Sequence, residues 1–216
     1  MNIVVILAGG SGVRFNSNKP KQYHQLLGKE VISYTVSAVQ EAQLCDTVII
    51  AAHDPYLMQL AERYGVNCCK GGQTHNETVS NALVHINENY PTCCKVLFAD
   101  SVRPLITADL IDKYFLLLDE FDSVITAQYV TDSLGKEGEQ FVSRDRYYLI
   151  QKPEAFKFNI LSQVFDVNSQ TTAIVQQMPK DSKVNKYFDM RYNLKITYLE
   201  DLQIAEALLS KNGQEV

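Results

Sequence analysis

The chain opens with MNIVVILAGGSGVRFNSNKPKQY, residues 1–23, in which a short apolar run leads directly into a glycine-rich stretch. The run Ile3–Leu7 has the length and composition of a buried β-strand. Three glycines follow, and cations stand at Arg14, Lys19 and Lys21. Glycine lets the backbone approach a ligand closely, and successive backbone N–H groups form a concavity that binds anions. The stretch therefore predicts a strand followed by a phosphate-binding turn, with a tight turn and solvated cations as the alternative.

The two common nucleotide-binding signatures do not fit this turn. A Walker A loop needs Lys and then Ser or Thr after its last glycine, but Gly12 is followed by Val13. The dinucleotide fingerprint needs a third glycine, and Phe15 occupies that position. A triphosphate still matches the turn, because Arg14 can bind an anion through two nitrogens and Lys21 adds a point charge.

Short apolar runs alternate with longer amphipathic segments along the rest of the chain. We expect strands at residues 2–7, 47–52, 66–69, 95–99 and 123–127, and helices at residues 30–42, 55–64, 76–89, 107–120 and 200–211. Such alternation predicts an α/β fold with a mostly parallel sheet covered on both faces. Ligands of such sheets bind beyond the carboxyl ends of the strands, which places residues 8–21 and 99–104 at the site.

Residues 128–150, QYVTDSLGKEGEQFVSRDRYYLI, interrupt the alternation. Their strand-like ends flank a Gly-Lys-Glu-Gly turn, which predicts a β-hairpin. An alternating α/β architecture does not require such a hairpin, and an extra hairpin on a compact domain often packs on a partner chain. We therefore expect one domain over residues 1–216, with a protruding β-arm at approximately 128–150.

The composition is that of an ordinary globular protein, with 46% hydrophobic and 21% charged residues and a net charge of −5. Nucleic-acid binders are usually basic, so a nucleic-acid partner is not expected. No apolar stretch approaches the ~20 residues of a membrane span, and we expect no secretory signal before the first strand. The five cysteines have neither a disulfide framework nor zinc-site spacing, so we expect free thiols in a cytoplasmic protein.

Four motifs in order resemble those of the cytidylyltransferases that activate polyol phosphates, a family that includes methylerythritol-phosphate and ribitol-5-phosphate cytidylyltransferases. They are LAGGSGVRF with KPKQY in residues 7–23, GGQTHNETV in 71–79, ADSVRPLIT in 99–107 and YNLKITYLEDLQIAEAL in 192–208. The third and fourth are most similar to the ribitol-5-phosphate branch. The resemblance spans nearly the whole chain and implies a single Rossmann-like nucleotidyltransferase domain. It also implies that CTP and an alditol phosphate react, with Mg²⁺, to a CDP-alditol and pyrophosphate.

The resemblance also implies roles for particular residues. Arg14, Lys21 and Lys195 match the catalytic cations that stabilise charge on the α-phosphate and leaving group. Asp100 matches the aspartate that holds the metal and lies near the substrate, and Arg103 matches the substrate-side arginine of the same motif. The CTP site of the family maps onto Leu7, Ala8, Gly9, Gly10, Ser11, Gly12, Gly71, Gly72, His75, Thr78 and Asp100.

Structural alternatives remain for several of these residues. Asp100 could cap a helix or turn, Arg103 could form a structural ion pair, and Lys195 could keep an edge strand soluble. In the family the arm embraces the other subunit of a homodimer and completes its site. By that match, Ser133 and Arg146 would contact the substrate.

The chain departs from the family pattern mainly on the substrate side. His75 stands where arginine is usual, Ala99 replaces a frequent histidine, and Lys152 replaces a usual threonine before Pro153. We expect the substrate to be ribitol-5-phosphate or a shorter polyol phosphate such as glycerol phosphate, for cell-surface polymers such as teichoic acid or capsule. Methylerythritol phosphate, for isoprenoid synthesis, is one alternative, and a non-catalytic nucleotide-binding protein is another.

Overall fold

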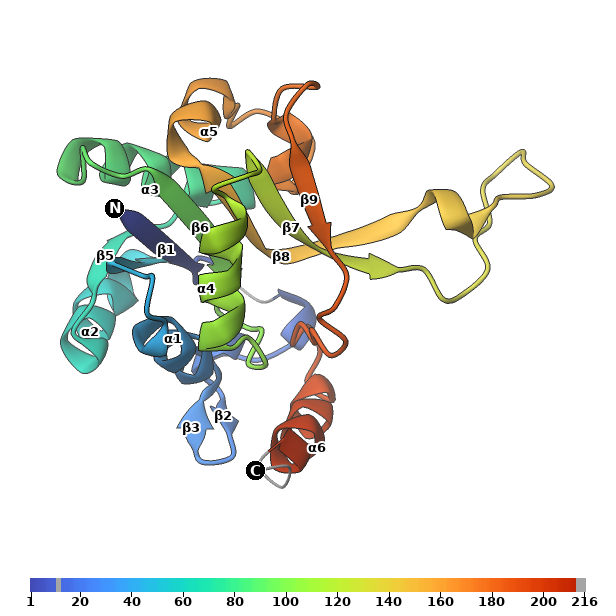
Figure 1. The fold of residues 1–216 in the computed structure, drawn as a ribbon. Coiled ribbons are helices and arrows are strands. Elements are labelled where there is room, and N and C mark those ends of the chain that lie inside the picture. Colours follow the sequence, from blue (N-terminus) through green and yellow to red (C-terminus); the bar gives the residue numbers. More distant parts are fainter. Residues whose placement is uncertain (11–12, 213–216) are drawn as a thin grey trace.

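The computed structural model describes residues 1–10 and 13–212. Its centre is a seven-stranded sheet with the strand order β5-β4-β1-β6-β8-β7-β9 (Figure 1). Strand β1 (Asn2–Leu7) lies between β4 (Thr47–Ala52) and β6 (Lys95–Asp100), and both pairs are parallel. Strand β5 (Asn67–Lys70) extends the parallel half beyond β4.

The other half of the sheet contains an inserted antiparallel strand. Strand β8 (Tyr148–Lys157) runs antiparallel between β6 and β7 (Ser123–Tyr129). Strand β9 (Val184–Tyr187) pairs in parallel with β7 at the edge. The described sheet is therefore mostly parallel, which confirms the predicted α/β fold.

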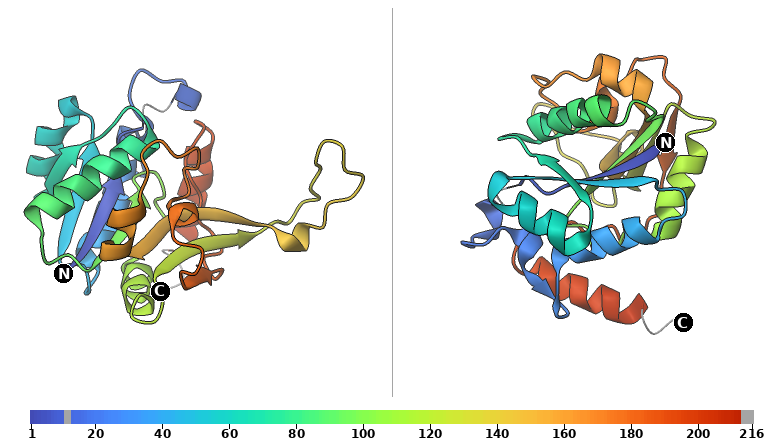
Figure 2. Two further views of the ribbon diagram at one scale, coloured as in Figure 1. Left: turned by 90° about the horizontal axis from the view of Figure 1, so that it is seen from above. Right: turned by 90° about the vertical axis from the view of Figure 1, so that its left-hand side faces the viewer.

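Helices cover both faces of the sheet (Figure 2). The side chains of β1 alternate between two apolar cores, with Val4 and Ile6 in one and Ile3, Val5 and Leu7 in the other. This alternation explains why both faces need a helical layer. The first core is covered by α1 (Val31–Glu41), α2 (Asp54–Tyr64) and α4 (Ala108–Leu117), and the second by α3 (His75–Asn89) and α5 (Phe158–Val164).

Helix α6 (Asp201–Asn212) packs on a third apolar cluster, below the loops that follow β1 and β6. Its Ala205 belongs to a cluster with Phe15, Leu26, Val31, Val102 and Ile196. The small ladder of β2 (Gln25–Leu26) and β3 (Lys29–Glu30) adjoins the same cluster. This packing brings the C-terminal segment next to the N-terminal loop. Within the described residues, no helix combines the length and the apolar character that crossing a membrane requires.

An arm projects from the sheet between β7 and β8 (Figure 1). The two strands pair regularly only as far as Tyr129 and Tyr148. Beyond them the backbone is mostly irregular, apart from an isolated bridge between Lys136 and Glu139 and the 3₁₀ helix η3 (Arg144–Arg146). The predicted hairpin over 128–150 is thus paired at its base, and the turn-forming Ser, Asp and Gly residues of the tip carry no continuous ladder.

Candidate active site

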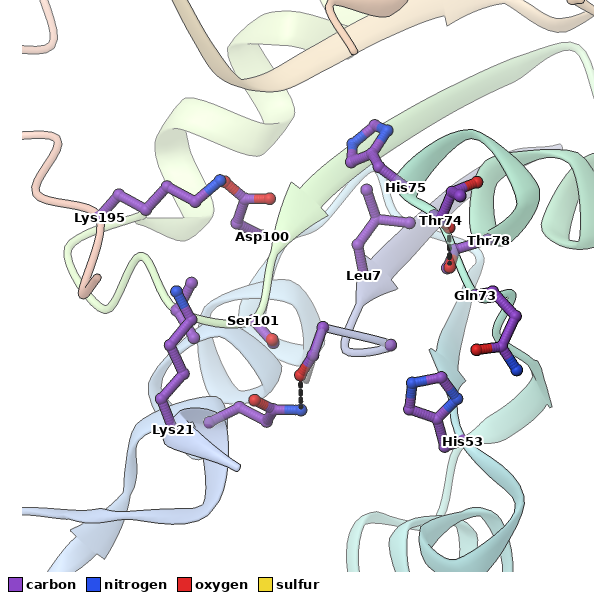
Figure 3. Close-up of a pocket in the computed structure, with 14 residues that line it drawn as sticks. Leu7, Lys21, His53, Gln73, Thr74, His75, Thr78, Asp100, Ser101 and Lys195 are labelled. Atoms are coloured by element: carbon purple, nitrogen blue, oxygen red, sulfur yellow. Dashed lines mark hydrogen bonds and ion pairs between the residues drawn. The ribbon is translucent and has the colours of Figure 1, made fainter. Parts of the chain in front are cut away.

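A cavity of about 290 Å³ opens at the carboxyl edge of the parallel strands (Figure 3). Leu7 ends β1, Asp100 ends β6, His53 follows β4 and His75 begins α3, and all four line the cavity. Lys21 and Lys195 line it from the two segments that α6 packs against. The cavity therefore lies at the sheet edge that the strand pattern predicts.

Two glycine segments approach each other closely next to this cavity. A Cβ atom on Gly9 would lie 3.0 Å from the Oγ1 atom of Thr78, and one on Gly71 would lie 3.4 Å from the Cα atom of Gly9. A Cβ atom on Gly72 would lie 2.1 Å from the Cβ of Glu77, which is a severe overlap. Glycine at these positions lets the two backbones approach each other closely.

The start of α3 is fixed by a capping box, in which Thr74 accepts a hydrogen bond from the Glu77 N–H at 3.1 Å and Glu77 accepts one from the Thr74 N–H at 3.2 Å. Thr78 Oγ1 donates to the Thr74 carbonyl and accepts from the Gly72 N–H, both at 3.0 Å. Gln22 holds the opposite wall by donating to the Ala8 carbonyl at 2.7 Å. The cavity walls are thus fixed by hydrogen bonds that involve no ligand.

Lys21 and Lys195 place two positive charges on one side of the cavity. Lys21 is half-buried, and its Nζ donates to the Ile196 carbonyl at 2.7 Å. Burial, followed by the positive charge of Lys195, lowers the pKa of Lys21 to about 8. Lys195 is more exposed and points toward Asp100, with Nζ 3.2 Å from Oδ2 (Figure 3). Both lysines are positioned to attract an anion.

Asp100 is the acidic residue among the described lining residues of this cavity, and only 7% of it is exposed. Its Oδ2 accepts a hydrogen bond from Arg103 Nε at 3.0 Å, and Arg103 also donates to the Asn193 carbonyl at 2.6 Å. Burial alone would raise the pKa of Asp100, but the charges of Lys195 and Arg103 hold it below its usual range. Asp100 is therefore ionised at neutral pH.

A single carboxylate of this kind fits Mg²⁺. The described residues contain no cluster of three or more His, Cys, Asp or Glu side chains that could hold a metal by themselves. Mg²⁺ is usually bound by one or two carboxylates together with substrate phosphates and water. Arg103 and Lys195 both approach Oδ2 of Asp100, so neither of these cations occupies Oδ1.

A smaller cavity of about 110 Å³ adjoins the first and shares His75, Asp100 and Lys195 with it. Its other walls include Arg103 and the ion-paired side chains of Lys152 and Glu154. Burial, followed by the charge of Lys152, lowers the pKa of His75, so the imidazole is neutral at pH 7. The two cavities therefore meet at one carboxylate, that of Asp100.

The predicted site residues separate into groups. The larger cavity brings together Leu7, Gly9, Gly10, Lys21, His75, Thr78, Asp100 and Lys195. Arg103 lines the smaller cavity, and Ala8, Gly71 and Gly72 belong to the supporting backbone. Arg14 is exposed in the 3₁₀ helix η1 (Val13–Phe15) and is not among the described lining residues, although its charge reaches Lys21.

Four further residues were predicted to belong to the site. Ser11 and Gly12 lie outside the described residues. Ser133 and Arg146 are exposed and line neither cavity, and the arm that carries them projects from the sheet (Figure 1). Sequence reasoning assigned no site role to Gln22, His53, Lys152 or Glu154. Lys152 was recognisable only as a departure from the family pattern.

The fold is that of a nucleotidyltransferase, as comparison with known proteins shows. The family model described as IspD, 2-C-methyl-D-erythritol 4-phosphate cytidylyltransferase, matches residues 2–211. The chain belongs to this family and is an enzyme of the cytidylyltransferase class.

Individual relatives cover almost the full chain. The 2-C-methyl-D-erythritol 4-phosphate cytidylyltransferase of Azobacteroides pseudotrichonymphae genomovar. CFP2 is 30% identical, over 95% of this chain and 97% of its own. The ribitol-5-phosphate cytidylyltransferase of Vibrio parahaemolyticus serotype O3:K6 is 29% identical, over 97% of this chain and 96% of its own. The crystal structure of 4-diphosphocytidyl-2C-methyl-D-erythritol synthase from Anaerococcus prevotii DSM 20548 matches with a TM-score of 0.81 at 24% identity. The match covers 97% of this chain and 96% of that one. The predicted family is confirmed, whereas the ribitol-5-phosphate branch is not, because relatives with both names match almost equally well.

Proposed function

We propose that the enzyme transfers CMP from CTP to an alditol phosphate, with ribitol-5-phosphate or a shorter polyol phosphate as the substrate, and releases pyrophosphate. The observation that carries this proposal is the position of Asp100 between Lys195 and Arg103, where the two cavities meet. The motifs ADSVRPLIT and YNLKIT and the ribitol-5-phosphate relative support the choice of substrate.

The larger cavity would hold CTP, with its triphosphate along the backbone of Gly9 and Gly10 and next to Lys21. Cytosine would be recognised by the segment of Gly71, Gly72 and Thr78, chiefly through backbone carbonyl groups, because the N–H groups of both glycines already bond within the protein. Fixed backbone groups distinguish a base edge without losing side-chain entropy. This orientation directs the α-phosphate toward the junction with the smaller cavity.

The alditol phosphate would enter the smaller cavity with its phosphate at the junction. A phosphate oxygen attacks the α-phosphorus of CTP in line, the bond to the β-phosphate oxygen breaks, and pyrophosphate leaves with the electron pair. This reaction depends on positioning and charge stabilisation more than on covalent catalysis. Lys21 and Lys195 supply positive charge where negative charge develops, and no protein group needs to take up a proton.

We also propose that Asp100 holds Mg²⁺ through the carboxylate oxygen that faces the cavity. The bound ion would neutralise charge on the phosphate oxygens of the nucleotide. Arg103 keeps the carboxylate oriented, because it is anchored to the Asn193 carbonyl as well as to Asp100.

A homodimer in which each arm reaches the partner's site is part of the proposal. The arm exposes large apolar side chains, with Phe141 81% and Tyr129 67% accessible. Such exposure is typical of interaction surfaces. Ser133 and Arg146 would then contact the alditol phosphate bound by the other subunit. Sedimentation at micromolar concentration tests this, and a monomer would refute it.

The function is tested by measuring pyrophosphate release from CTP and Mg²⁺ with ribitol-5-phosphate, glycerol phosphate and methylerythritol phosphate. UTP and ATP serve as control nucleotides. We expect turnover with CTP and with ribitol-5-phosphate or glycerol phosphate. Turnover with methylerythritol phosphate alone would refute the choice of substrate, and CTP binding without any pyrophosphate release would favour a non-catalytic nucleotide-binding protein.

A further inference from the structure

The smaller cavity contains a buried ion pair that the mechanism above does not use. Lys152 is 6% exposed and Glu154 is 1% exposed, and the Lys152 ammonium donates a hydrogen bond to Glu154 Oε1. A buried ion pair generally contributes no more stability than apolar side chains of the same volume. Stability alone therefore gives no reason for two charges at this position.

Glu154 is held by the backbone of a neighbouring segment. Its Oε1 also accepts from the Ile174 N–H at 3.3 Å, and its Oε2 accepts from the Val175 N–H at 2.9 Å. These two residues begin the 3₁₀ helix η4 (Ile174–Gln177). The carboxylate is thus fixed in place and uses both of its oxygens within the protein.

Lys152 has more donors than Glu154 uses. An ammonium group can donate three hydrogen bonds, and in the described part of the chain Glu154 accepts one. The backbone of Lys152 is also fixed, because its carbonyl accepts from Asn193 Nδ2 at 2.7 Å. Since Lys152 lines the cavity, its remaining donors are available to a ligand there.

The position of the reacting phosphate determines which part of the substrate Lys152 meets. In-line attack requires that phosphate near the α-phosphate of CTP, at the junction formed by His75, Asp100 and Lys195. The remainder of the substrate must then extend into the smaller cavity. That remainder carries hydroxyl groups, and a cation already neutralised by Glu154 suits neutral oxygen acceptors better than a second anion.

We propose that Lys152, positioned by Glu154, is a specificity-determining residue that donates hydrogen bonds to hydroxyl oxygens of the alditol chain. This inference rests on the proposed function, because it takes the second substrate to be an alditol phosphate. A threonine, as is usual in the family at this position, offers one short hydroxyl where Lys152 offers a longer and charged donor.

The test compares Lys152→Met with the unsubstituted full-length enzyme, with Mg²⁺ and the panel phosphate that this enzyme uses best. We expect the KM for that phosphate to rise roughly 10- to 100-fold, the range for losing a hydrogen bond to a charged group. The KM for CTP should stay within about twofold, since the nucleotide lies in the other cavity. Lys157→Met is the matched control, because Lys157 is an ion-paired lysine of the same strand that lines neither cavity.

Lys152→Met leaves Glu154 without its counter-charge and could unfold the protein, so the double variant Lys152→Met, Glu154→Gln is measured as well. It removes both charges and keeps one amide oxygen, which can accept from one of the two N–H groups of η4 that Glu154 binds. Equal changes in the two KM values, or an unchanged KM for the alditol phosphate in a folded variant, would overturn this inference alone. Absence of pyrophosphate release by the unsubstituted enzyme would instead overturn the proposed function, and this inference with it.

Discussion

Replacing Asp100 with asparagine removes one negative charge from the junction of the two cavities and keeps the size of the side chain. In the structure Asp100 and Arg103 are both about 8% exposed at their side chains and form an ion pair of 3.0 Å. Removing one partner of a buried pair costs ~3–5 kcal/mol, because the remaining charge stays buried. Asparagine still offers an oxygen to Arg103, so we expect a loss of about 2–4 kcal/mol. Lys195 adds little to this figure, since its side chain is 42% exposed.

This loss corresponds to a decrease in Tm of roughly 4–16 °C for a chain of this size. Thermal unfolding followed by circular dichroism at pH 7 measures it. The control is Asp119→Asn, which breaks the surface pair with Lys95 and should cost no more than about 1 kcal/mol. A Tm of Asp100→Asn within 2 °C of the unsubstituted protein would refute the reasoning that this carboxylate compensates buried cations.

The difference in stability between Asp100→Asn and the unsubstituted protein should depend on pH in a defined direction. The pKa of Asp100 is lowered in the folded protein, so its contribution to stability is fully present above ~3.9, the ordinary value of an aspartate. That contribution is lost as the pH falls through the folded-state value. The difference in the free energy of unfolding between Asp100→Asn and the unsubstituted protein should therefore narrow below about pH 4. Catalysis provides a separate readout, and we expect pyrophosphate release to fall by at least about 100-fold.

Four further predictions concern the cavity, its supporting backbone and the arm. Lys21→Ala should lower kcat by about 100-fold or more with a small change in CTP affinity, because its charge matters most in the transition state; equal losses in binding and turnover would show that it only anchors CTP. Because burial and Lys195 lower the pKa of Lys21 to about 8, kcat/KM should decline as the pH rises above 8 and the lysine loses its proton, and Lys21→Arg should remove this decline. Gly72→Ala should lower the free energy of unfolding by about 1–3 kcal/mol in a denaturant titration, since its Cβ would lie 2.1 Å from that of Glu77. Arg146→Ala should raise the KM for the alditol phosphate and leave the KM for CTP unchanged, and an unaltered KM would mean that the arm does not reach a site.

Hydrophobic patterning predicted the parallel half of the sheet well. The runs at 2–7 and 47–52 are β1 and β4 with the predicted bounds. The predicted strand 95–99 ends one residue before β6 does. Strand β8 was recognised only as far as residue 150. Its continuation, Gln151 to Glu154, is polar, and this polarity is compatible with a buried strand only because tertiary contacts pair Lys152 with Glu154. Helix α5 has 7 residues, too few for a helical periodicity to stand out.

The residues of the candidate site also separate into those that the sequence could place and those that it could not. The glycine loop and Asp100 could be placed from sequence because each directly follows a recognisable strand. Lys195 lies far from Asp100 in the sequence, and only the family resemblance, not spacing, brought the two together. Gln22 and Glu154 act through the Ala8 carbonyl and the Val175 N–H, and no local pattern reports such long-range hydrogen bonds.

The contacts of Ile196 have a consequence for synthesis of the protein on the ribosome. Its N–H donates to the Val102 carbonyl at 3.0 Å, and its own carbonyl accepts from Lys21, so one late residue fastens two earlier loops. The central strands β1, β4 and β6 can pair as soon as residue 100 has emerged, but this fastening has to wait until residue 196 has emerged as well. A nascent chain that ends before this residue would therefore assemble the central strands while the loops that carry Lys21 and Val102 are still unfastened, and the cavity would be completed only by the segment synthesised around residue 196.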